Sequence, residues 1–137
     1  MKKKVIKGQA ALEYLFVVGL VLMILIPLSN LAFKRANVSV TLSDASTAIN
    51  LIAKTADEVF FLGPGNKNTI DIYFPSSISN ISITNNEIIF NLNIFEENTE
   101  VFQISKANLS GNLTNFKGVH IVVIEHLDSG IVKISEK

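Results

Sequence analysis

The sequence predicts an α+β fold in which one long N-terminal helix packs on a small antiparallel β-sheet. An uncharged run of 20 residues, from Tyr14 to Phe33, is long enough to cross about 30 Å of hydrocarbon as a helix. Apolar residues then recur at steps of three and four as far as Leu62, which is the period of an amphipathic helix. After Gly65 apolar and polar residues alternate, which is the period of half-buried strands. The length of 137 residues suits one small domain plus an anchor.

The net charge of zero conceals an uneven distribution of charge along the chain. Four lysines precede the uncharged run, and Lys34 and Arg35 follow it directly. These flanks favour a cytoplasmic N-terminus and an exported C-terminal part. Beyond Arg35 the chain has 6 lysines against 11 acidic residues. Because this part lacks a basic patch with interleaved aromatic residues, we expect no nucleic-acid partner.

Two ordinary interpretations of the first 35 residues stay open. A secretory signal peptide needs an apolar core of about 7–15 residues and a small-x-small cleavage site. The run here is longer, and the best site, which ends at Ala32, has Asn30 where a small residue is required. A plain signal anchor fits the length and the flanking charges, but it gives no role to Glu13, which lies just inside the apolar segment.

A third interpretation gives Glu13 a role in assembly. Cleavage between Gly8 and Gln9 would remove the leading lysines and leave the whole apolar helix on the mature chain. In a staggered bundle of helices, Glu13 of one copy would then lie beside the new α-amino group of Gln9 on its neighbour. A partly buried carboxylate is tolerated when it is paired and costly when it is alone. The pair would therefore fix the register of the bundle, as a polar residue does in a coiled coil.

This arrangement resembles the class III signal peptide of type IV pilins. It is most similar to the archaeal pilins whose mature N-terminus follows a Gln-x-Ser-x-Glu-Tyr/Phe pattern. Gln9, Glu13 and Tyr14 match that pattern, and Ala11 stands where the family usually has serine. The resemblance covers about residues 1–35, with weaker similarity as far as Gly65.

The resemblance implies a structural subunit of an extracellular filament that serves surface attachment. Residues 1–8 would be the leader, which a prepilin peptidase removes, and residues 9–35 would be a transmembrane helix that becomes the filament core. The implied partners are identical or related pilin subunits, the peptidase, the membrane before assembly, and a pilus assembly platform with its ATPase. The precursor would lie in the cell membrane and the mature subunit at the cell surface. The alternatives are a minor pilin and a single-pass surface binding protein that does not polymerise.

The helical region is expected to have two further features. Pro27 lacks a backbone donor and disfavours helical geometry just before it, so a bend is expected near Leu25 and Ile26. Residues 36–62 form the amphipathic half, and Gly63-Pro64-Gly65 ends it.

Residues 66–137 are predicted to form the antiparallel head. Asn85-Asn86 and Asp128-Ser129-Gly130 are the expected hairpin turns, and Lys106 to Gly118 is expected to be a polar loop. The predicted strands are Ile70–Phe74, Ile78–Thr84, Glu87–Phe95, Val101–Ser105, Val119–Leu127 and Ile131–Ser135.

Four N-glycosylation sequons start at Asn37, Asn80, Asn108 and Asn112. Glycans need exposed backbone, so the pair in the predicted loop, Asn108 and Asn112, is the best placed. We expect at least one of the four to be glycosylated, in line with the resemblance to glycosylated archaeal surface filaments.

No catalytic or metal-binding constellation can be assembled from the sequence. His120 and His126 are six residues apart on one predicted strand, about 20 Å by strand rise, and are expected to be surface residues. The chain has no cysteine, and an acidic turn is the expected structure around Glu96, Glu97 and Glu100. We therefore expect neither an enzyme nor a cofactor or metal site.

Overall fold

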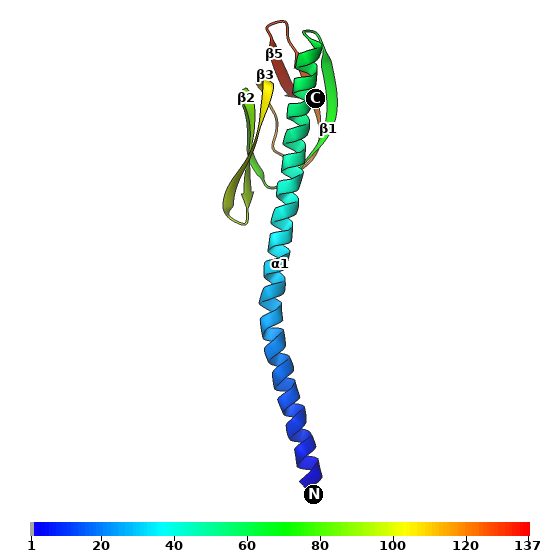
Figure 1. Ribbon diagram of the computed structural model, residues 1–137, viewed down its shortest axis with the longest axis vertical. Helices are drawn as coiled ribbons and strands as arrows, with labels where there is room; N and C mark the ends of the chain where they lie inside the picture. Colours follow the sequence, from blue (N-terminus) through cyan, green and yellow to red (C-terminus); the bar gives the residue numbers. More distant parts are fainter. Residues whose placement is uncertain (1) are drawn as a thin grey trace. The chain divides into compact units, whose positions relative to one another are not determined.

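A computed structural model describes residues 2–137, with side chains from Gly8 onward (Figure 1). One long helix, α1 (Lys2–Leu62), is followed by a five-stranded sheet. The strands are β1 (Lys67–Phe74), β2 (Ile78–Ile94), β3 (Glu97–Asn112), β4 (Gly118–His126) and β5 (Ile131–Glu136). The predicted α+β class, with a long N-terminal helix packed on a small sheet, is confirmed. Of the predicted leader, residues 1–8, the side chains before Gly8 lie outside the described part.

The chain divides into two compact units, one up to Val38 and one from Ser39 to Lys137, and α1 contributes to both. The second unit, called the head below, contains the amphipathic half of α1 and the whole sheet. The helix face that packs on the sheet repeats at steps of three and four, as predicted. Its buried members are Ala45, Ala48, Ile49, Ile52, Ala56 and Val59. Gly63, with φ of 93°, ends the helix as the expected left-handed cap.

Helix α1 continues through Pro27 without a break. Proline has no N–H to donate to the carbonyl one turn earlier. Two residues further on, the hydroxyl of Ser29 donates to the carbonyl oxygen of Leu25 at 2.9 Å. Serine back-bonding of this kind also favours bending of a helix. It lies beside Leu25 and Ile26, where the bend is predicted.

The sheet is mixed, whereas the sequence predicted a wholly antiparallel sheet. The strand order is β1-β4-β5-β3-β2, and β3 pairs with β5 in parallel. The tight turn at Asp128–Gly130 makes β5 antiparallel to β4, as expected for the second hairpin. Strand β1 pairs with the other edge of β4, and the remaining edge of β5 pairs with β3.

Strand β2 folds back on itself at the predicted turn, Asn85-Asn86. The N–H of Asn93 donates to the carbonyl of Ser77 at 2.8 Å. In one straight strand these residues would lie about 50 Å apart at 3.3 Å per residue. Asn85 has a left-handed φ of 54°, which suits a tight reversal.

The predicted loop at Lys106–Gly118 is wrong for its first half, because β3 continues to Asn112. Residues Asn108–Asn112 form the parallel pairing with β5. At Gly111 a Cβ atom would lie 1.9 Å from the carbonyl oxygen of Ile134, so this pairing requires a glycine. The predicted acidic turn is also only partly correct. Phe95 and Glu96 make the turn, with φ of 51° and 70°, whereas the other two glutamates belong to β3.

A polar contact attaches α1 to β3 within the head. The carboxylate of Asp57 accepts from the Ser105 hydroxyl at 2.6 Å and from the Lys106 N–H at 2.7 Å. Ser105 is buried, and its oxygen also accepts from the N–H of Ala107. The contact satisfies backbone groups where β3 changes partner from β2 to β5.

Candidate functional site

The first candidate site is the apolar half of α1, whose described side chains are exposed. From Gly8 to Asn37 every described residue is exposed except Val18, which is partly exposed. This helix is long and apolar enough to cross a membrane, with a mean hydropathy of 2.5 over its most apolar 18 residues, none of them buried. The core helix of a soluble protein would be mostly buried, so this segment can serve as a membrane anchor.

The predicted cleavage and assembly residues lie together in the first described turns. The carboxamide Nε2 of Gln9 lies 3.4 Å from Oε1 of Glu13, a weak contact between exposed groups four residues apart. The ring of Tyr14 is 73% exposed. The peptide bond between Gly8 and Gln9 lies inside α1, next to the poorest helix former after proline.

A shallow apolar groove follows on the same helix, about one to four turns beyond Gln9. Gly19 is one of its lining residues, and a Cβ atom there would meet nothing within 4 Å. The groove is lined by Leu12, Leu15, Phe16, Gly19, Leu20 and Met23. Small residues on membrane helices let a second helix approach closely.

All four sequon asparagines are exposed, but none lies in a loop. Asn37 lies in α1, Asn80 in β2, and Asn108 and Asn112 both in β3. The reason for favouring the last pair is therefore wrong, since they belong to a paired strand. The third residue of the last sequon, Thr114, is also engaged by hydrogen bonds to Glu136.

The two histidines are buried, contrary to the prediction of surface residues. His120 is 7% exposed and His126 is 5% exposed. Both lie on the inner face of β4, in register with the buried residues Val122 and Ile124. That alternation was readable in the sequence, because a side chain two positions from a buried valine points to the same face.

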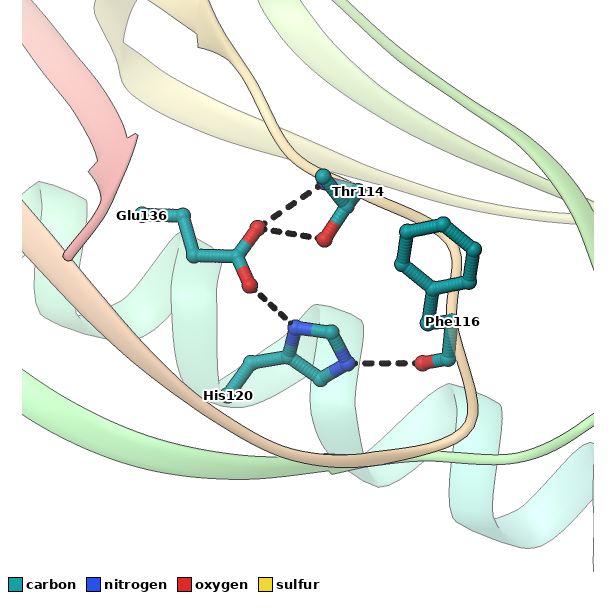
Figure 2. A network of polar contacts seen from close by, with 4 residues as sticks. All are labelled: Thr114, Phe116, His120 and Glu136. Atoms are coloured by element: carbon teal, nitrogen blue, oxygen red, sulfur yellow. Dashed lines mark hydrogen bonds and ion pairs between the residues drawn. The ribbon is translucent and has the colours of Figure 1, made fainter.

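A polar network surrounds His120 (Figure 2). Nδ1 lies 2.6 Å from Oε1 of Glu136, and Nε2 lies 2.6 Å from the carbonyl oxygen of Phe116. Thr114 donates to the other carboxylate oxygen of Glu136, from its hydroxyl at 2.5 Å and from its N–H at 3.1 Å. The Thr114 hydroxyl, and to a smaller extent His120, lower the pKa of Glu136, and this effect exceeds the opposing effect of burial.

His126 lacks such partners. Its ring packs on Phe60 of α1, with centroids 5.2 Å apart, and its Nδ1 is buried without a hydrogen bond. Within the described residues, no group of three or more potential metal ligands comes together.

Comparisons with protein-family models, with curated proteins and with solved structures find no match to this chain. The function must therefore be inferred from the chemistry of the residues described above.

Proposed function

We propose that this protein is a structural subunit of a type IV pilus-like filament, made as a membrane-held precursor and cleaved after Gly8. The observation that carries the proposal is an apolar helix, exposed on all sides, with one carboxylate near its start. In this proposal the filament contains identical or related subunits and serves surface attachment.

The exposed helix needs an apolar environment in each state of the subunit. Before assembly the lipid provides it, and afterwards the helices of other copies do. Lipid tails are as apolar as leucine, so the transfer gains little hydrophobic free energy. Close packing at the groove around Gly19 and the pairing of Glu13 with a neighbour's Gln9 amine would then favour the bundle.

The described contacts of Glu13 are consistent with this role. Among the residues whose side chains are described, from Gly8 onward, the carboxylate meets a neutral carboxamide at 3.4 Å, and this contact does not compensate its charge. Cleavage would create a cation on Gln9, and a staggered neighbour would bring that cation to the carboxylate.

The processing peptidase, the assembly platform and its ATPase act on the chain from outside it in this proposal. Mass spectrometry of the native N-terminus tests the first step. We expect a mature chain that begins at Gln9, and a Gly8→Val variant that keeps residues 1–8. A native protein that retains Met1 would exclude the pilin function and favour a single-pass anchored binding protein.

A further inference from the structure

Both ring nitrogens of the buried His120 face oxygen atoms at hydrogen-bond distance (Figure 2). The carbonyl oxygen of Phe116 can only accept, so Nε2 must carry a hydrogen. An ionised Glu136 can also only accept, so the 2.6 Å contact between Nδ1 and Oε1 needs a second hydrogen.

Two arrangements of hydrogens meet these requirements. In one, an imidazolium donates to a carboxylate; in the other, a carboxylic acid donates to a neutral imidazole. Both contain one proton more than a neutral His120 beside an ionised Glu136, so the proton belongs to the pair. Without it, lone pairs would face each other at 2.6 Å, in a place where the histidine is too buried for water to separate them easily.

The groups around the pair come from α1, β1 and β5. From β1 the ring meets Phe74, stacked at 4.4 Å, and from β5 it meets Glu136. Asp44 of α1 and Asp71 of β1 line a groove beside Ile72, the register partner of His120.

The basic side chains on the neighbouring elements are exposed. The Lys133 side chain is exposed on the opposite face of β5, and Lys117 and Lys137 are also exposed. Among the described residues, no other ionisable side chain makes a hydrogen bond or ion pair with His120.

We propose that the proton shared by His120 and Glu136 is a pH-operated latch on residues 113–117, which join β3 to β4. The network holds this segment at Thr114, through its N–H and hydroxyl, and at the carbonyl of Phe116. The Phe116 ring, 71% exposed, is carried on the same segment. Loss of the proton releases the segment and lets this aromatic surface move. The latch does not depend on the filament function.

The proton count sets the steepness of the response. The closed segment binds one proton that the open segment releases once the pH exceeds the ordinary pKa of a histidine, about 6.5. By linkage, the equilibrium constant for opening then rises about tenfold per pH unit, until the closed pair itself loses its proton.

Hydrogen exchange measured by mass spectrometry on the full chain in detergent micelles tests the latch. As the pH is raised above 6.5, and after correction for intrinsic exchange, peptides covering residues 113–118 should lose protection, by up to about tenfold per unit. Peptides from the helix face around Ile52 should not change. A wild-type segment whose protection is independent of pH would overturn the proposal.

Two variants separate the shared proton from burial alone. In Glu136→Gln the carboxamide can donate to Nδ1 and accept from Thr114, so the segment should stay protected without a pH slope. His126→Gln changes the other buried histidine of β4, outside the network, and should keep the wild-type slope. A wild-type slope in Glu136→Gln would show that the latch is elsewhere.

The nitrogen resonances of His120 provide a readout that requires no variant. In the closed state they should report a hydrogen on Nε2, and they should keep their closed-state values while exchange accelerates. An Nε2 without a hydrogen while the segment is still protected would overturn the proposal.

Discussion

At the scale of single residues, Glu13 is the side chain on which the filament proposal depends. We expect Glu13→Ala to insert into the membrane normally, because it removes a charge from an apolar segment. Incorporation into filaments should fall at least tenfold, since the Gln9 amine of a neighbour would lose its partner. Quantifying subunits in sheared filaments and in membranes measures both effects. Glu13→Gln is the matched control for size, and equal incorporation of either variant would show that the pairing is not needed.

Glu136 predicts how the stability of the head depends on pH on the acid side. Its pKa is lowered in the folded state, so its contribution is complete above the unfolded value of about 4.5 and is lost as the pH falls through the folded pKa. Thr114→Val removes the hydroxyl that contributes most to this shift. We expect it to cost about 1 kcal/mol at neutral pH and to reduce the loss of stability in acid. Urea denaturation at pH 7 and at steps down to pH 3 measures both quantities, and an unchanged acid slope would contradict the assignment.

At the scale of the elements, the parallel pairing of β3 with β5 depends on the absence of a side chain at Gly111. A Cβ atom there would meet the backbone of Ile134, which cannot rotate away. We expect Gly111→Ala to destabilise the head by about 1–3 kcal/mol, the usual cost of overpacking. Ser110→Ala, at the exposed neighbouring position, should stay within about 0.5 kcal/mol of the wild type. Thermal unfolding compares the two, and equal midpoints would show that the strands can separate at little cost.

Local patterns predicted the elements better than their partners. The helix, its apolar stripe and both hairpin turns follow from the spacing of apolar residues and from Gly, Asn and Asp at the turns. The second half of β3 was missed because Asn108, Ser110 and Asn112 suggested a loop, although Ala107 and Leu109 alternate with them. The network at His120 could not be predicted, because Thr114 and Glu136 meet through pairing between strands that are distant in sequence.

At the scale of the whole molecule, the two units predict that the head folds without the apolar segment. A chain that begins at Ser39 keeps the buried helix face and the complete sheet. We expect it to be soluble and to unfold cooperatively, with the same transition by circular dichroism and by tyrosine fluorescence. A chain that begins at Gly63 leaves the apolar face of the sheet uncovered and should not fold. A Ser39 chain without cooperative unfolding would show that the head needs its anchor.

The position of β5 has a consequence for biogenesis. Strand β5, which follows the other four strands of this sheet along the chain, lies in the middle of the sheet, between β4 and β3. If the head is exported N-terminus first, β5 must emerge from the translocation channel before the sheet can be completed. A nascent chain interrupted before Ile131 would then present unpaired strand edges to proteases and chaperones, so that incomplete copies are removed before they can enter any assembly.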